Sequence, residues 1–181
     1  MGPGGSPRRS LLHYDVNEAG VIVEVVVDWD HTARGDDEFP LLSADVIGTV
    51  LSQHITGDET REFIADLINS VRRLGQPRTI NYRCDAPKIK RFMQMILTPG
   101  EDGRVSIIHR LIREEPLPAQ IRFAAERASD SVRCSMCNRV RHNEVWRESE
   151  GALAANLLRA ENENFVIYKV CEDCRAAALG A

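Results

Sequence analysis

The stretch GDETREFIADLINSVRRLGQP (Gly57–Pro77) contains the clearest helix signal of the chain. Thr56 and Glu59 have the spacing of a capping box, and apolar residues then recur at helical period. These apolar positions are Phe63, Ile64, Leu67, Ile68 and Val71. Gly75 can cap the C-terminus and Pro77 prevents the helix from continuing. The pattern predicts a helix over Gly57–Leu74 that buries one face.

The residues before this helix predict a strand and a second, shorter helix. Val21–Val27 (VIVEVVV) is rich in β-branched residues, which favour a strand. The polar stretch DHTARGDDEFP (30–40) predicts a loop with a short helical turn. Ser43 can then N-cap a helix that runs to about Ser52, with Asp45 near its positive end.

Three strands are predicted after the long helix. They are RTINYRC (78–84), KRFMQMIL (90–97) and RVSIIHRLI (104–112). The first alternates, so that Ile80, Tyr82 and Cys84 share one face. The turn residues of TPGEDG (98–103) lie between the second and third strands, which predicts an antiparallel hairpin. Together with the preceding elements this indicates an α+β fold.

Composition narrows the class of protein. The chain has 181 residues, 43% hydrophobic and 28% charged, which is typical of a globular protein and not of a disordered or fibrous one. Its net charge is −4, whereas a generally basic nucleic-acid binder has a surplus of positive charge. The longest apolar run is far shorter than the roughly 20 residues that span a bilayer, and the N-terminus lacks a signal-peptide core. We therefore predict a cytoplasmic location and no membrane association.

The cysteines divide into two pairs and a single residue. Cys134 and Cys137 form one C-x-x-C, Cys171 and Cys174 form another, and Cys84 stands alone. Zinc needs four donors in a tetrahedron, and each C-x-x-C supplies two thiolates. Because all four positions would then be filled by protein, the predicted Zn²⁺ is structural and not catalytic.

The sequence around the pairs predicts a small zinc module of treble-clef or ribbon type. Asn138 tolerates the left-handed conformation that the turn after a knuckle often needs. EVWRE (144–148) and NFVIYKV (164–170) are plausible strands, and CEDCRAAAL (171–179) opens a helix whose N-terminus favours thiolate. Three alternatives stay open: His142 in place of one cysteine, a redox-active dithiol, and buried cysteines without a ligand.

Basic residues near the cysteines allow two interpretations. They are Arg133, Arg139, Arg141, Lys169 and Arg175. They could bind phosphate, or they could offset the formal charge of −2 on a zinc bound by four thiolates. From 130 to 181 there are seven Lys and Arg against eight Asp and Glu, a net −1, which favours charge compensation. A zinc-dependent nucleic-acid-binding regulator using Arg139 and Arg141 is kept as the alternative function, with a thiol redox switch as a second.

Two passages resemble the PAS family of sensory domains. DVIGTVLSQHITGDETREFI (45–64) is similar to the helix–loop–helix passage of that family, and residues 72–115 are similar to its final hairpin region. The resemblance covers about 20–115. The tail also resembles some bacterial PAS signalling proteins, in which a C-x-x-C-x-R-x-R…W segment and a second C-x-x-C follow the sensor domain. The residues that match this tail are Cys134, Cys137, Arg139, Arg141, Trp146, Cys171 and Cys174.

The resemblance implies a fold, a domain order and a class of function. The fold would be a PAS-like five-stranded antiparallel sheet with flanking helices, followed by the zinc module. We predict a leader or flanking helix at 1–19, the PAS-like domain at 20–115, a helical linker at 116–131 containing AQIRFAAERA (119–128), and the zinc module at 132–181. The function would be non-enzymatic signal transduction, with a homodimer and an unidentified partner protein as expected partners.

PAS domains can enclose a small-molecule ligand between the sheet and the helices. His54, Tyr82 and His109 are the candidate ligand-binding residues. The long helix has no histidine of the kind that haem-binding members use, and the cysteine motif of photoactive flavin members does not occur. The ligand of this pocket is therefore not specified by the sequence.

Overall fold

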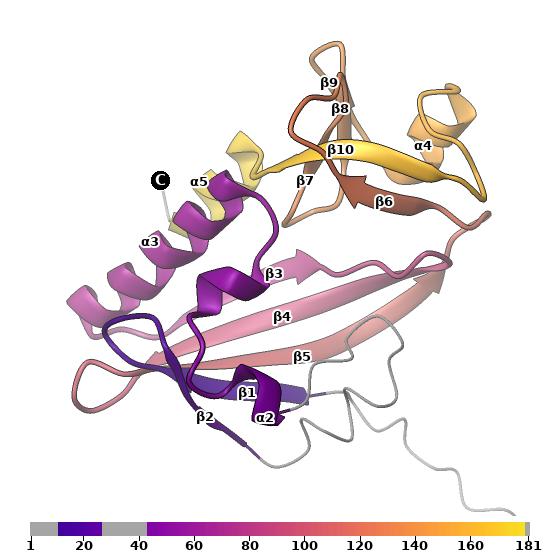
Figure 1. Ribbon diagram of the computed structural model, residues 1–181. Helices are drawn as coiled ribbons and strands as arrows, with labels where there is room; N and C mark the ends of the chain where they lie inside the picture. Colours follow the sequence, from indigo (N-terminus) through magenta and orange to yellow (C-terminus); the bar gives the residue numbers. More distant parts are fainter. Residues whose placement is uncertain (1–10, 27–42, 180–181) are drawn as a thin grey trace, which may run out of the picture.

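The computed structural model describes residues 11–26 and 43–179 and shows an α+β fold with two five-stranded sheets. In Figure 1 a larger sheet lies below and a smaller one above, with the longest helix on the left. None of the helices in the described ranges is long and apolar enough to cross a membrane.

The first sheet is entirely antiparallel, with the strand order β2-β1-β5-β4-β3. Its strands are β1 Leu11–Val16, β2 Ile22–Val25, β3 Arg78–Arg83, β4 Ile89–Pro99 and β5 Val105–Pro116. The predicted hairpin is confirmed as β4 and β5, which pair along their whole length and extend beyond the predicted bounds. Ile80 and Tyr82 of β3 lie in or against the core, as the alternation predicts.

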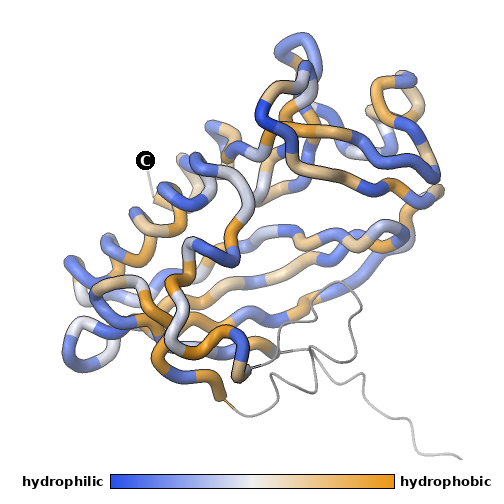
Figure 2. Tube along the Cα trace, in the orientation of Figure 1, coloured by the Kyte–Doolittle hydropathy of each residue, from blue (hydrophilic) through white to orange (hydrophobic). Residues whose placement is uncertain are grey.

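The connection between β2 and β3 contains α2 (Ser43–Val46), the 3-10 helix η1 (Leu51–His54) and α3 (Asp58–Leu74). The apolar stripe of α3 packs on the first sheet, where Phe63, Leu67 and Val71 are fully buried. Figure 2 shows hydrophobic residues recurring along α3 and along the strands beneath it. The core of the larger unit therefore lies between α3 and one face of this sheet.

The ends of these helices differ from two predictions. Gly57 is the N-cap of α3, with a φ of 89° and no side-chain cap bond, so the capping box from Thr56 to Glu59 is wrong. The predicted C-cap is confirmed, because Gly75 has a left-handed conformation and its N–H donates to Val71 O. The helix expected from Ser43 to about Ser52 ends at Val46, since Gly48 has a φ of 86°, which is not helical.

The second sheet has the order β6-β10-β7-β8-β9, with β10 parallel to both of its neighbours. Its strands are β6 Arg122–Ala125, β7 Val132–Cys134, β8 Val140–His142, β9 Val145–Arg147 and β10 Glu163–Lys169. α4 (Ser149–Ala154) joins β9 to the segment before β10, and α5 (Glu172–Leu179) follows β10. The two strands predicted between the cysteine pairs correspond to β9 and β10.

Two helices expected from the sequence are strands instead. The flanking helix expected in the leader is wrong at 11–16, because these residues form β1 between β2 and β5, with Tyr14 and Val16 buried. The helix expected within 119–128 is wrong because Arg122–Ala125 pairs with β10. In both segments a partner strand outweighs the local preference. The loop expected at 30–40 lies outside the described residues.

The two sheets are joined by direct contacts. The Arg83 N–H donates to Met136 O over 2.7 Å, Thr60 Oγ1 lies 2.6 Å from Ser135 Oγ, and Arg78 donates to Ala178 O over 2.8 Å. Ion pairs add to the joint, in which the buried Arg83 and Lys90 of the first sheet pair with partly exposed acidic residues at α4. These acidic residues are Glu148 and Glu150. One hydrophobic cluster runs through both parts.

Candidate metal centre

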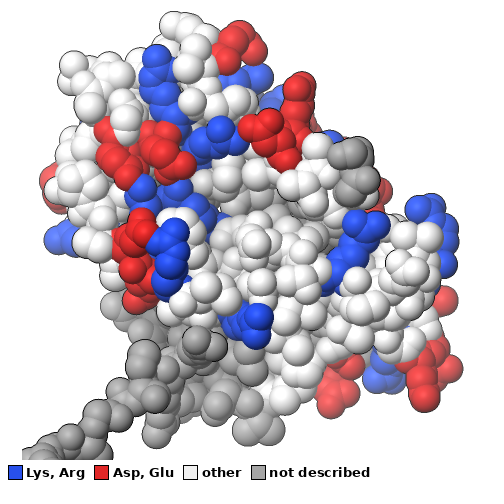
Figure 3. Space-filling model, turned by 180° about the vertical axis from the view of Figure 1, so that it is seen from behind, with Lys and Arg blue, Asp and Glu red and all other residues white. Residues whose placement is uncertain are grey.

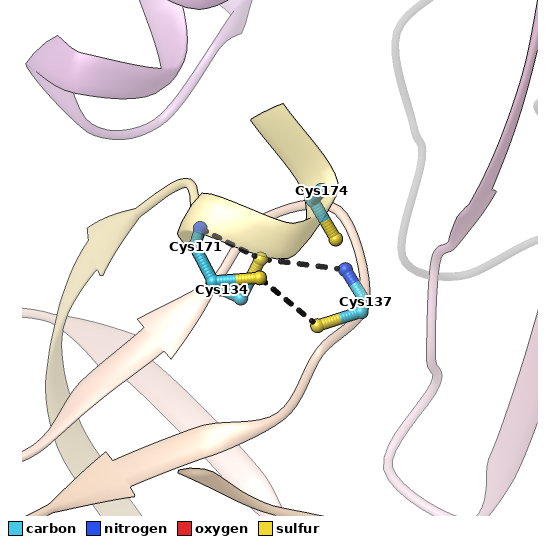
Figure 4. A group of neighbouring side chains, drawn as sticks. All are labelled: Cys134, Cys137, Cys171 and Cys174. Atoms are coloured by element: carbon cyan, nitrogen blue, oxygen red, sulfur yellow. Dashed lines mark hydrogen bonds between the residues drawn. The ribbon is translucent and has the colours of Figure 1, made fainter. Parts of the chain in front are cut away.

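Parallel pairing of two strands brings the two cysteine pairs together. Cys134 is the last residue of β7 and lies opposite Lys169, the last residue of β10. Because parallel strands end at the same edge of a sheet, the residues that follow each strand meet there. Cys171 comes two residues after Lys169 and Cys174 lies in the first turn of α5. Figure 4 shows the four side chains converging from the knuckle and the start of this helix.

The first pair lies in a tight knuckle between β7 and β8. The Asn138 N–H donates to Cys134 O and the Cys134 N–H donates to Arg139 O, each over 2.9 Å. Asn138 has a φ of 60°, the left-handed conformation predicted for it. The N–H groups of Met136, Cys137 and Cys171 point at Cys134 Sγ from 3.4, 3.5 and 3.4 Å. Such N–H donors stabilise negative charge on a sulfur.

The four sulfur atoms have the separations that a small cation requires. They all lie within 4.8 Å of one another, and Cys137 Sγ is 3.8 Å from Cys171 Sγ. A tetrahedron with Zn–S bonds of about 2.3 Å has edges of about 3.8 Å. All four thiols are free of disulfides. The cysteines are therefore positioned to hold a metal ion, with two of them buried and two half-buried.

Without a metal, the cluster favours a thiolate at Cys137 and the neutral thiol at Cys134 and Cys174. Thiol donors from Cys134 and Cys174, and then Arg139, hold the pKa of Cys137 well below its usual range. Donation to Cys137 is the largest of the effects that raise the pKa of Cys134 to about 11. Donation to Cys134 and Cys137 raises the pKa of Cys174 well above its usual range. One thiolate thus suppresses ionisation of its neighbours, which is the situation a divalent cation relieves.

Arg139 is a basic residue whose guanidinium contacts the cysteine sulfurs directly. Its guanidinium donates to Cys137 Sγ at 3.3 Å and Cys171 Sγ at 3.8 Å, and it also pairs with Asp173 at 2.8 Å. The interpretation of charge compensation therefore fits Arg139. Arg141 instead pairs with Glu144 over 3.2 Å and lies over the Trp146 ring.

Three of the other basic residues near the cysteines contact partners away from the sulfurs. Lys169 pairs with Glu59 over 2.7 Å, Arg175 lies over the Phe63 ring, and Arg133 lies over Phe123 and Tyr168. On the face seen in Figure 3, basic and acidic side chains are interspersed. His142, the alternative ligand, approaches Ser131 Oγ at 3.5 Å and is not part of the group of four.

Tyr82 and His109 come together on the inner face of the first sheet, and Tyr14 joins them. Tyr82 Oη lies 2.8 Å from His109 Nδ1, and Tyr14 Oη lies 3.0 Å from His109 Nε2. Burial lowers the pKa of His109 to about 4 and raises the pKa of Tyr82 well above its usual range. Tyr14 was missed because its segment reads as a leader; the alternation of Leu12, Tyr14 and Val16 is the signal that marks it as a strand.

His54 lies apart from this group. It is exposed on η1, and its Nε2 lies 2.6 Å from Thr49 Oγ1. Two cavities of about 460 and 420 Å³ occur in the described part of the chain, and neither is lined by His54, Tyr82 or His109. Ligand binding by these three residues stays a prediction.

Comparison with known proteins adds no assignment: no family model matches this chain, and no curated protein matches its sequence.

Proposed function

We propose that Cys134, Cys137, Cys171 and Cys174 bind one structural Zn²⁺ within a non-enzymatic PAS-type signal-transduction protein. The observation that carries the proposal is the convergence of four sulfurs within 4.8 Å. Four soft donors in a tetrahedron are typical of structural zinc. A site filled by four protein ligands has no open position for a substrate, so the metal serves the fold.

The sensor part of the proposal is supported by the first sheet. It has five antiparallel strands, and the helices between β2 and β3 end in α3, which covers one face. This is the arrangement that the resemblance of residues 20–115 to PAS domains implies. Four of its five strands are predicted from the sequence, and β1 is the fifth. A protein of this class acts through a partner protein or a second copy of itself in the cytoplasm.

The arginines give the nucleic-acid alternative little support. Arg139 is held by Cys137, Cys171 and Asp173, and Arg141 by Glu144 and Trp146. A phosphate would have to displace these partners. Structural charge compensation at Arg139 therefore remains the favoured interpretation.

Metal analysis tests the zinc site directly. Full-length protein purified without added metal should contain one zinc per chain, measured by inductively coupled plasma mass spectrometry. Cys134→Ser should lose that zinc, because it removes a buried ligand that also accepts three backbone N–H groups. Cys84→Ser is the matched control, since Cys84 lies on the connection from β3 to β4, away from the cluster.

Three outcomes would decide against the proposal. Wild-type protein with well under one zinc per chain would do so, as would a Cys134→Ser variant with unchanged zinc. A zinc-free protein with native amide exchange and a reversible disulfide would instead support the redox alternative.

A further inference from the structure

A cavity of about 460 Å³ lies at the joint between the two sheets. One wall is the connection from β3 to β4, residues 84–87, and the opposite wall comes from β7, α4 and β10 of the second sheet. The segment 117–123, which links the sheets, lines it as well. The cavity is separate from the four cysteines and from the cluster of Tyr14, Tyr82 and His109.

Arg133 is the unusual residue of this cavity. It is 8% exposed, and within the described ranges no carboxylate pairs with it. Its guanidinium lies 3.9 Å from the centre of the Phe123 ring and 5.9 Å from that of Tyr168. Tyr168 Oη accepts one bond from it over 3.3 Å, and Arg133 Nε has no partner. At least the Nε donor of this guanidinium is therefore left without an acceptor.

Arg83 shows how the same chain satisfies a buried arginine. It is also 8% exposed, but Asp85 accepts from its Nε over 3.0 Å and from a second nitrogen, and Glu148 accepts from a third. A buried charge without such partners is strongly unfavourable. Stacking on aromatic rings offsets only part of that cost. Arg83 therefore has carboxylate partners, whereas Arg133 has no anionic partner among the described residues.

Ser149 supplies a second unsatisfied group in the same cavity. It is 1% exposed, and its Oγ has no hydrogen-bond partner. Buried hydroxyls are nearly always bonded, so two unsatisfied polar groups lining one cavity point to a ligand. A guanidinium and a hydroxyl are together a donor set for an anion.

We propose that this cavity binds a small organic monocarboxylate, with its carboxylate on Arg133 and Ser149 and its apolar body on the segment 117–123. A planar carboxylate matches the fork of a guanidinium. Asp85 also lines the cavity but is paired with Arg83, which leaves Arg122 and Arg133 beside Glu163. One negative charge against two positive ones suits a monoanion better than a phosphate dianion. The apolar body would contact Leu117, Ile121 and Phe123. This binding site is independent of the zinc site and of the PAS assignment.

Titration of the full-length, metal-loaded protein with benzoate, phenylacetate and hexanoate tests the proposal. Amide chemical shifts recorded by NMR should move in a saturable way at residues 84–87, 117–123, 133 and 149. Benzamide, which has the shape of benzoate without its charge, should bind at least tenfold more weakly. Arg133→Gln should weaken benzoate binding at least tenfold, whereas Arg159→Gln, an exposed arginine at the other cavity, should leave it unchanged.

Each contrary result would overturn the proposal. These results are the absence of saturable shifts with all three carboxylates, equal binding of benzamide and benzoate, and unchanged binding in Arg133→Gln. Chloride or inorganic phosphate causing the same shifts at the same concentrations would show an adventitious ion only. Because the benzamide comparison uses the wild-type chain, the proposal stays testable even where the Arg133 variant fails to fold.

Discussion

The two sheets have the same number of strands but are stabilised in different ways. In the first, β4 and β5 have 11 and 12 residues, and its core holds most of the large fully buried side chains. In the second, β7, β8 and β9 have three residues each, and its fully buried side chains include only Val140, Val166 and Cys134 among the largest. Short strands with few apolar groups seldom fold alone, and the proposed zinc would supply the stability that this core lacks.

Removal of the proposed metal should have the largest effect on stability, and it should destabilise the second sheet much more than the first. Structural zinc contributes about 10–16 kcal/mol in small zinc domains, which is comparable to the roughly 5–15 kcal/mol that stabilises a typical whole domain. After chelation we expect fast amide exchange in β7, β8, β9 and α5, a smaller increase in α3 and β3, and the least change in the hairpin of β4 and β5. Hydrogen exchange read by mass spectrometry measures this gradient. A uniform response across both sheets would contradict the comparison.

A core substitution in the first sheet should give the converse result. Leu97 on β4 is 0% exposed, and Leu97→Ala should lower the free energy of unfolding by about 2–5 kcal/mol through the cavity it leaves. Zinc content should stay at one per chain. Urea denaturation combined with metal analysis checks both values, and loss of zinc in this variant would mean that the second sheet depends on the first.

The two sheets also differ in how well their elements can be predicted from the sequence. The helix α3 and the hairpin of β4 and β5 are predicted well because Phe63, Leu67 and Val71, and the turn at Gly100 and Gly103, are local signals. The cysteine cluster is predicted by the spacing within each pair. What brings the pairs together, the parallel pairing of β7 with β10, involves strands more than 30 residues apart and leaves no local pattern.

The two wrong helices have the same physical cause. β1 pairs with β5, where Tyr14 lies opposite Ile107, and β6 pairs with β10, where Ala124 lies opposite Phe165. Each partner lies far along the chain, so local propensity is outweighed by contacts that a reading of neighbouring residues does not include. The role of Arg133 is hidden for the same reason, because Phe123 and Tyr168 flank it only in the fold.

Burial of His109 should give the first sheet a pH dependence of its own. It is separate from loss of the proposed zinc, which acid also causes by protonating the thiolates. Burial holds the pKa of His109 at about 4, against 6.5 in the unfolded chain, so the unfolded state binds more protons between these values. Stability is therefore complete above pH 6.5 and falls as the pH drops toward 4, by at most roughly 3 kcal/mol. Because His109 is only partly buried by its exposed fraction, water screens the charge and reduces this figure.

Urea denaturation at pH 7, 5.5 and 4.5 tests this expectation. His109→Gln should flatten the pH profile, because it removes the titrating ring but keeps a hydrogen-bonding group between Tyr14 and Tyr82. His54→Gln, at an exposed position, is the control and should keep the wild-type slope. Equal slopes for wild type and His109→Gln would show that another group is responsible.

The smallest expected effect concerns the joint between the sheets. Gly57 has a φ of 89°, and a Cβ there would lie 2.8 Å from Tyr168 Cβ and 2.9 Å from Tyr168 O on β10. Gly48 has a φ of 86° with nothing within 4 Å of that position. Both alanine substitutions should lose about 1–3 kcal/mol from backbone strain, and Gly57→Ala should lose more. Thermal unfolding compares the pair; equal losses would mean that the close approach of α3 to β10 contributes nothing.

The parallel pairing of β7 with β10 also sets the order in which the metal centre can be assembled. Cys137 and Cys171 are 34 residues apart, and the knuckle emerges from the ribosome before its partner pair exists. At about 5–20 residues per second, this interval lasts roughly 2–7 s. During that time the first two thiols lack the second half of the proposed site, so a four-cysteine site cannot form until β10 and the start of α5 have been synthesised.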